Sequence, residues 1–197
     1  MAYNHGMTAI ILAAGSSSRM GTNKLLLPFR GKPLILSVLH TALAFTGSVI
    51  VVTGHEKEGI EEAIAGSGAR SVYAPDHGKG QRYSTLAGIE AAGDDDFMIL
   101  PGDLPLLDMS DLEGTVSLLG THTIARAFHN GIPGHPVAYR REHGPRLLAS
   151  NCSMREYLEG KDIGIYEGSI GCVMDTDTPQ SYRMILASGD RDTSVLH

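Results

Sequence analysis

Short, continuous apolar segments alternate along this chain with segments whose apolar residues recur at helical spacing. A strand that is apolar on both faces suits the middle of a parallel sheet, and a helix must then return the chain to the start of the next strand. The alternation therefore predicts an α/β fold, a Rossmann-like three-layer sandwich with a mostly parallel sheet. We expect strands at residues 7–14, 49–53, 70–74, 97–100, 123–128, 135–139 and 171–174. We expect helices from Pro33, at 56–65, 84–92, 145–150 and 154–159, and after Pro179.

Size and composition narrow the class of protein. The 197 residues suit one domain, and 42% hydrophobic with 19% charged residues excludes a disordered chain. The net charge of -6 disfavours a nucleic-acid partner. Cys152 and Cys172 are too few for a disulfide framework or a cysteine-based zinc cluster. No apolar run approaches a membrane span, and the start of the chain lacks a basic segment followed by an apolar core, so we expect a cytoplasmic protein without a membrane partner.

The basic side chains near the start of the chain face no local acidic partner. Residues 1–55 contain Arg19, Lys24, Arg30 and Lys32 but no Asp or Glu. Glycine is also abundant, with 24 residues, and glycine lets a backbone approach a ligand closely. This combination predicts a site for a small anion near the amino terminus.

The loop after the first expected strand is the strongest candidate for that site. It contains Gly15, Arg19, Gly21 and Lys24, but neither a Walker A loop nor a dinucleotide fingerprint. Gly15 and Gly21 allow backbone N–H groups to point at phosphate oxygens, and Arg19 and Lys24 supply positive charge. The alternative is a serine-rich surface turn with solvated cations.

The same loop carries a family resemblance. Leu12-Ala13-Ala14-Gly15-x-x-x-Arg19-Met20-Gly21-x-x-Lys24, followed by Gly31-Lys32-Pro33-Leu34, resembles the signature of nucleotidyltransferases with a nucleotide-diphospho-sugar transferase fold. Within them it is similar to the molybdenum cofactor cytidylyltransferase group of the MobA-like NTP transferase family. The resemblance implies that this loop wraps a nucleoside triphosphate and that Arg19 and Lys24 hold its phosphates as catalytic residues. The Ala-Ala-Gly form implies CTP rather than GTP.

A second glycine loop leads into an expected helix. Gly80 and Ser84 flank Arg82 there, and from the residues alone Ser84 either caps the helix or binds a ligand. The resemblance implies that Gly80 and Ser84 contact the nucleoside. Arg82 either contacts phosphate or is exposed.

Two acidic segments are candidates for a metal site. Asp103 follows a buried strand in Gly102-Asp103-Leu104-Pro105, and Mg²⁺ commonly takes one or two protein carboxylates with phosphate oxygens. The alternative is an aspartate that bonds its own turn. The segment resembles the family's Gly-Asp-x-Pro motif, which implies that Asp103 holds Mg²⁺ and that Gly102 lies at the nucleotide. In Asp175-Thr176-Asp177-Thr178-Pro179 we assign a second ligand to Asp175 and a helix cap to Asp177 or Thr178.

A third motif implies an acceptor site. Gly131-Ile132-Pro133-Gly134-His135-Pro136 resembles the cytidylyltransferase segment that approaches the acceptor, which implies roles for Gly134, His135, Pro136 and the later Arg155. His135 is expected to bond a phosphate or pterin heteroatom and not to act as a general base, because a phosphate acceptor is already ionised near neutral pH. The chain departs from the family at 150–155, which lacks an aspartate and two glycines, and at Ser181, where the family has an acidic residue.

These features predict an Mg²⁺-dependent nucleotidyltransferase that transfers CMP from CTP to the terminal phosphate of molybdopterin and releases pyrophosphate. We expect one domain over residues 1–197, with a nucleotide-binding half at 1–108 and an acceptor-binding half at 109–197. A molybdoenzyme or its chaperone is a further expected partner. The alternatives are a molybdopterin guanylyltransferase, a sugar- or polyol-phosphate cytidylyltransferase, a redox enzyme acting on pyridine compounds, and a non-catalytic nucleotide- or cofactor-binding accessory protein for a molybdoenzyme.

Overall fold

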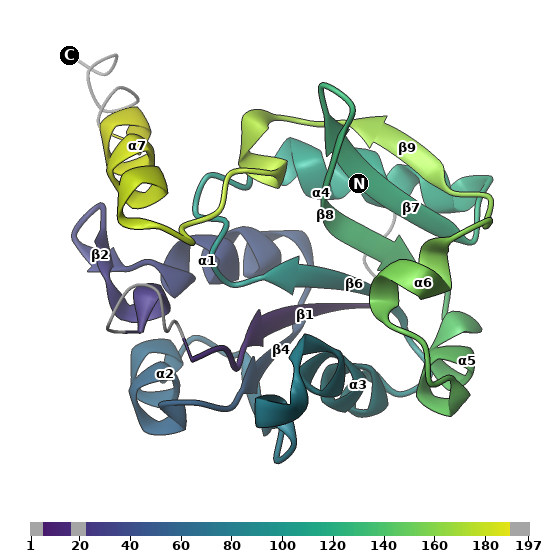
Figure 1. Ribbon diagram of the computed structural model, residues 1–197, viewed down its shortest axis with the longest axis horizontal. Helices are drawn as coiled ribbons and strands as arrows, with labels where there is room; N and C mark the ends of the chain where they lie inside the picture. The colour runs from purple at the N-terminus through teal and green to yellow at the C-terminus, as the bar shows by residue number, and fades with distance from the viewer. Residues whose placement is uncertain (1–5, 17–22, 190–197) are drawn as a thin grey trace.

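A seven-stranded sheet forms the centre of the protein (Figure 1). The computed structural model describes residues 6–16 and 23–189. The strand order in the sheet is β5-β4-β1-β6-β8-β7-β9, and β2 and β3 form a separate two-stranded ribbon. The strands are β1 Met7–Ala13, β2 Pro28–Phe29, β3 Lys32–Pro33, β4 Ser48–Thr53, β5 Arg70–Tyr73, β6 Asp96–Pro101, β7 Ile124–His129, β8 Ile132–Tyr139 and β9 Gly164–Glu167.

Seven α-helices and four short 3-10 helices connect the described strands. The α-helices are α1 Ile35–Phe45, α2 Lys57–Ile64, α3 Gln81–Ala92, α4 Met109–Ser117, α5 His143–Ala149, α6 Met154–Leu158 and α7 Pro179–Gly189. The 3-10 helices are η1 Lys24–Leu26, η2 His77–Lys79, η3 Leu118–Gly120 and η4 Ile170–Cys172. None of these helices, in the part of the chain that the structure describes, is long and apolar enough to span a bilayer.

The sheet is mostly parallel, which confirms the expected fold class. β1 pairs in parallel with β4 and β6, β4 with β5, and β7 with β9. Only β8 runs against its neighbours β6 and β7. Because β8 follows β7 through a short hairpin, no crossover helix is needed there.

Helices cover both faces of the sheet. One apolar core joins side chains of α1, α2 and α4 to one face, and a second joins α3, α5 and α6 to the other. Figure 1 shows α3 in front of the strands and α1 behind them. The three layers follow from strands that are apolar on both faces, as in β1, where six of seven residues are buried.

The strand ends bring two of the expected loops together. β1 and β6 are neighbours, with Leu12 opposite Pro101. The Gly102 N–H donates to the Leu12 carbonyl at 3.0 Å, and a Cβ atom at residue 102 would lie only 3.0 Å from that oxygen. Gly102 therefore allows the loop after β1 and the loop after β6 to meet at the carboxyl edge of the sheet, where ligands bind in such folds.

Two expected helix starts are wrong. Pro33 belongs to the β2–β3 ribbon opposite Pro28, and α1 begins at Ile35. The ribbon forms because Arg30 and Gly31 both have positive φ and reverse the chain just before the helix.

Ser84 does not cap a helix. It lies inside α3, which starts at Gln81, and Gly80 precedes it with a φ of 124° that favours glycine. Glycine rather than serine therefore makes the turn into α3.

The second half of the chain differs more from expectation. Residues 170–172 form the 3-10 helix η4 and not a strand, and the edge strand of the sheet is β9. The chain turns after β9 because buried Asp111 accepts bonds from the backbone N–H and the hydroxyl of Ser169, each at 2.7 Å. Helix α4 was not predicted, and its first turn is a capping box made by Asp108 and Asp111.

Candidate active site

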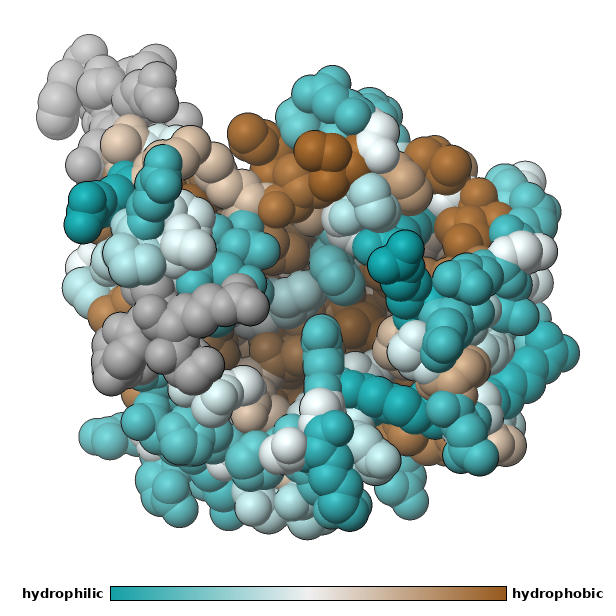
Figure 2. Space-filling model, in the orientation of Figure 1, coloured by the Kyte–Doolittle hydropathy of each residue, from teal (hydrophilic) through white to brown (hydrophobic). Residues whose placement is uncertain are grey.

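A pocket of about 600 Å³ lies at the carboxyl edge of the sheet. Figure 2 shows the molecule hollowed near the middle of the drawn face, with hydrophobic residues in the depth of the hollow. A pocket of this size suits a nucleotide or another medium-sized ligand. Its walls come from both halves of the chain: Leu12, Ala14, Gly15, Lys24, Leu25, His77, Gln81, Ser84, Pro101, Asp103, Leu104, Pro133, Gly134, His135, Cys172, Val173, Asp175 and Asp177.

Lys24 lies between the acidic side chains that line the pocket. Its ammonium donates to the carboxylates of both Asp103 and Asp177, which lie far apart in the sequence. The side chains of Lys24 and Asp103 are each 15% exposed. Burial by itself would lower the pKa of Lys24, but the two carboxylates outweigh it and raise the pKa, so Lys24 is a cation at neutral pH.

Local structure fixes the position of Lys24. It begins η1, and the side chain of Asn23 accepts a bond from the Leu25 N–H at 3.1 Å at the start of that turn. Asn23 is itself buried, and Leu25 packs into the core. The lysine therefore extends from an anchored turn into the pocket.

The acidic residues at the pocket suit a divalent cation. Asp175 lies beside Asp177 and accepts the Asp177 backbone N–H at 3.1 Å. Burial raises the pKa of Asp175, and the negative charges of Asp177 and Asp103 raise it further. Lys24 thus contacts two carboxylates, Asp175 adds a third acidic side chain beside them, and such oxygen ligands suit a hard cation.

The carboxylates do not form a complete metal cage. Over residues 6–16 and 23–189, no cluster of three or more His, Cys, Asp or Glu side chains is arranged to ligate a metal. Mg²⁺ in nucleotide sites uses one or two carboxylates and completes its shell with phosphate oxygens and water. The residues therefore fit a magnesium ion that arrives with a nucleotide.

The expected nucleotide residues separate into two groups. Leu12, Ala14, Gly15 and Ser84 line the pocket, and Ser84 reaches it from the first turns of α3. Ala13, Gly80 and Gly102 do not line the pocket. Ala13 is buried in the core, Gly80 turns the chain into α3, and Gly102 permits the contact between β1 and β6. The expected Arg19 and Gly21 lie outside the described residues.

Two polar pocket residues in the nucleotide half were not predicted. His77 belongs to η2 and packs against Gly54. A Cβ atom at residue 54 would lie 2.8 Å from the His77 Cβ atom, so any side chain there would collide with His77. Gln81 is the first residue of α3, and within the described chain its side-chain amide makes no hydrogen bond. Polar residues beside the glycine loop were the available signal, but only Gly80 and Ser84 of this segment were expected to contact the nucleoside.

The acceptor motif forms a bulge in the sheet. Arg126 of β7 pairs with Val137 of β8, whereas Phe128 pairs with Pro133. The segment 134–136 of β8 therefore lies opposite a single residue of β7, which makes it a bulge. Bulges often turn side chains toward a site. Gly134 and His135 line the pocket, and Pro136, which follows a cis peptide bond, is buried.

His135 is neutral in this bulge. Burial and the nearby positive charge of Arg126 lower the pKa of His135 to about 4, from an ordinary value of 6.5. Its Nδ1 lies 3.3 Å from the Ile99 carbonyl oxygen. Since a carbonyl oxygen only accepts, Nδ1 carries the proton and Nε2 keeps a lone pair. His135 can thus accept a hydrogen bond from a ligand through Nε2, but at neutral pH it brings no positive charge to a phosphate.

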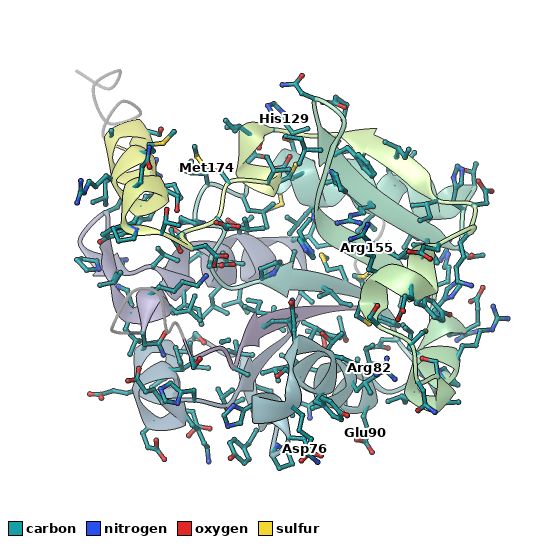
Figure 3. All side chains as sticks on the ribbon, in the orientation of Figure 1. Asp76, Arg82, Glu90, His129, Arg155 and Met174 are labelled. Atoms are coloured by element: carbon teal, nitrogen blue, oxygen red, sulfur yellow. The ribbon has the colours of Figure 1, made fainter. Side chains whose placement is uncertain are left out.

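Two arginines lie outside the pocket wall. Arg155 is exposed on α6 and is not part of the pocket wall. Arg82 does not face a phosphate site, because its guanidinium donates to the backbone carbonyls of Ser150 and Cys152. Figure 3 shows Arg82 between α3 and the α5–α6 region and Arg155 beside α6. Arg82 therefore fixes the segment that departs from the family pattern.

Comparison with known proteins assigns the family. Residues 9–161 match the MobA-like NTP transferase domain. The chain belongs to this family. The matched MobA-like NTP transferase domain contains most of β1, the Lys24 turn, Asp103 and the β8 bulge, while Asp175 and Asp177 follow it.

Relatives agree with this assignment. The chain is 30% identical over 180 residues to the molybdenum cofactor cytidylyltransferase of Escherichia coli (strain K12), a match that covers 88% of this chain and 92% of that protein. These findings make the chain a nucleotidyltransferase.

Solved structures agree with the fold. A nucleotidyl transferase from Methanothermobacter thermautotroptrophicus aligns with a TM-score of 0.82 at 23% identity, over 96% of this chain and 100% of that one. Rv0371c from Mycobacterium tuberculosis H37Rv in complex with manganese aligns with a TM-score of 0.73 at 20% identity, over 93% and 99% of the two chains.

Proposed function

We propose that this protein transfers CMP from CTP to the terminal phosphate of a molybdopterin-type cofactor and releases pyrophosphate, with Mg²⁺ as the metal. The observation that carries the proposal is the contact of Lys24 with Asp103 and Asp177 in a pocket lined by both halves of the chain. Such a site can hold the phosphates of a nucleotide and an acceptor side by side. The 30% identity to a molybdenum cofactor cytidylyltransferase supports the choice of base and acceptor.

We assign roles to the residues accordingly. The nucleotide binds to the half at 1–108 and the acceptor to the half at 109–197. The nucleotide residues are Leu12, Ala13, Ala14, Gly15, Arg19, Gly21, Lys24, Gly80, Ser84 and Gly102, of which Ala13, Gly80 and Gly102 shape the loops. The acceptor residues are Gly134, His135, Pro136 and Arg155. Asp103 is the first metal ligand, and Asp175 or Asp177 the second.

The chemistry needs alignment and charge more than acid–base catalysis. An oxygen of the acceptor phosphate attacks the α-phosphorus of CTP in line. The new P–O bond forms as the bond to the leaving pyrophosphate breaks. Lys24 neutralises charge on the transferring and leaving phosphates, and no base is needed because the acceptor is already ionised. Neutral His135 orients the acceptor by accepting at Nε2 a hydrogen bond from an N–H group of the pterin, because an ionised phosphate has no hydrogen to donate.

A divalent cation at the carboxylates would supply Lewis-acid charge to the α-phosphate. Asp103 is the residue best placed to hold it, because it is largely buried at the carboxyl edge of the sheet and already faces a cation in Lys24. The manganese complex of Rv0371c supports a divalent cation in this fold.

The test is pyrophosphate release with each of CTP, GTP, ATP and UTP, in the presence of Mg²⁺ and molybdopterin cofactor. We expect release with CTP and little with the other three nucleotides. Asp103→Ala should abolish release while the unfolding transition stays cooperative, and Asp162→Ala, which removes a carboxylate that is 91% exposed, should keep full activity. A preference for GTP would overturn the base assignment. Binding without turnover, with any nucleotide, would support a non-catalytic accessory protein.

A further inference from the structure

Arg126 is a cation in the acceptor half that the proposed reaction has not used. It lies on β7 two residues after Ile124, so both side chains point to the face of the sheet that α3, α5 and α6 cover. Arg126 is half-buried, and its Nε donates to the Gly134 carbonyl oxygen at 2.9 Å. It therefore supports the β8 bulge from behind the pocket wall.

The charge of Arg126 has no acidic partner in the described chain. None of the ion pairs between described residues includes it, whereas Arg140, also half-buried, pairs with Asp96 at 2.7 Å. Burial lowers the pKa of Arg126, and no carboxylate is among the groups that oppose this shift. The guanidinium of this half-buried cation lies 5.8 Å from the centre of the Phe128 ring, but it has lost part of its hydration without gaining an anion. An anionic ligand therefore gains free energy by binding beside it.

The guanidinium of Arg126 keeps the two nitrogens, Nη1 and Nη2, that can bind an oxyanion side by side. Nε is committed to Gly134, while Nη1 and Nη2 make no hydrogen bond with any described residue. Two parallel N–H groups match two oxygens of a phosphate. The positive charge also acts on His135, since it contributes to the lowered pKa of that residue. Gly134 and His135 both line the pocket, so Arg126 adjoins it on the acceptor side.

We propose that Arg126 binds the phosphate group of the acceptor and holds it beside the bulge formed by residues 134–136. The inference rests on the proposed function and deepens it, because it makes the acceptor a phosphate ester recognised by charge. Lys24 then serves the nucleotide, and Arg126 serves the acceptor. The same chemistry fits a phosphate of the nucleotide, and the experiment must separate these two sources.

Inorganic phosphate is the probe, used with CTP and Mg²⁺ at saturation so that the nucleotide site is filled. Wild-type protein should show a further, saturable rise in melting temperature with phosphate. Arg126→Gln, which keeps a donor for Gly134 but loses the charge, should weaken this phosphate response about tenfold or more. Arg126→Lys, which keeps the charge without the fork, should weaken it less. Arg183→Gln on α7 is the matched control, because Arg183 is an exposed arginine outside the pocket wall, and it should leave the response unchanged.

Two readouts separate an anion site from a purely structural role. The first readout is CTP binding, whose midpoint should be the same in wild type and Arg126→Gln. The second is turnover, in which Arg126→Gln should raise the KM for the acceptor by at least the factor by which it weakens phosphate binding. The KM for CTP should change little. An unchanged phosphate response in Arg126→Gln would refute the inference. A parallel loss of CTP binding would assign Arg126 to the nucleotide and refute it as well. If no nucleotide is transferred at all while the phosphate response depends on Arg126, the proposed function fails and the anion site remains.

Discussion

Three basic side chains show how the environment of a residue decides its use. Lys24 faces two carboxylates in the pocket, Arg82 donates to backbone carbonyls, and the two NH2 groups of half-buried Arg126 bond to no described residue. In the sequence nothing but the type of residue marks them, and all three are basic. Only their partners in the folded chain separate a lysine that lies in the pocket from an arginine that holds a loop.

The pH dependence of stability tests the state of His135. Its pKa is about 4 in the folded protein and 6.5 ordinarily, so between these values the unfolded chain takes up a proton that the folded protein does not. The free energy of unfolding should therefore fall as the pH drops from about 6.5 to 4. His135→Asn keeps a donor for the Ile99 carbonyl but cannot titrate, and it should show a flatter profile.

Urea unfolding at several pH values measures this difference. His40→Asn, at an exposed position of α1, is the control for removing a histidine and should keep the wild-type slope. Equal slopes for wild type and His135→Asn would contradict the assignment of a neutral, buried imidazole.

At the scale of elements, the positions of α3 and the loop after β6 depend on close packing at glycine. Gly88 is buried in the middle of α3, which packs against β1 and β4. An added Cβ atom there would overlap the Ile10 side chain and lie 3.0 Å from Val52 Cγ2. Gly88 thus acts on the site indirectly, by letting α3 carry Gln81 and Ser84 to the pocket.

Gly88→Ala should push α3 away from the sheet. Ile10 and Val52 are buried in the core and cannot move freely, so overpacking should lower the free energy of unfolding by about 1–3 kcal/mol. CTP affinity should fall with it, because Ser84 shifts. Gly47→Ala is the control, since a Cβ atom at residue 47 meets nothing within 4 Å. Chemical denaturation measures both variants, and an unaffected Gly88→Ala protein would contradict the packing described.

At the scale of the whole molecule, the site exists because the two halves of the chain meet at one edge of the sheet. Lys24 and Asp177 are 153 positions apart, yet they are in direct contact. Asp103, between them in the sequence, completes the group from the end of β6. The contact of Lys24 with Asp177 links the amino-terminal loop to the segment before α7. A ligand that binds at this contact should therefore change how stably the two halves of the chain are held together.

Lys24→Met tests this coupling without measuring activity. The variant leaves Asp103, Asp175 and Asp177 together without the ammonium, and their repulsion should lower the free energy of unfolding by about 1–2 kcal/mol. Millimolar Mg²⁺ should restore more stability to Lys24→Met than it adds to wild type, because the ion replaces the lost charge. Lys57→Met, which removes a surface lysine 3.8 Å from Glu61, should show no such magnesium effect. An equal response of all three proteins would contradict a cation site at these carboxylates.

The sequence predicted well wherever the pattern is local. Continuous apolar runs identified β1, β4 and β6, because a strand buried on both faces leaves few polar positions. The loops after these strands were found for the same reason, and with them Gly15, Lys24 and Asp103 at the pocket. Prediction was poorer after residue 108, where β9 is short and exposed on alternate residues and η4 depends on Asp111 far away in the sequence.

The amino-acid sequence by itself determined the fold class, the position of the glycine loops and the residues able to carry charge at the strand ends. These properties depend on spacing along the chain and on the conformational freedom of glycine. The tertiary structure alone decided which charges meet. It placed Asp177 on Lys24, turned Arg82 toward the backbone of residues 150–152 and left Arg126 without an anion. Such pairings depend on distances across the sheet, which no local pattern encodes.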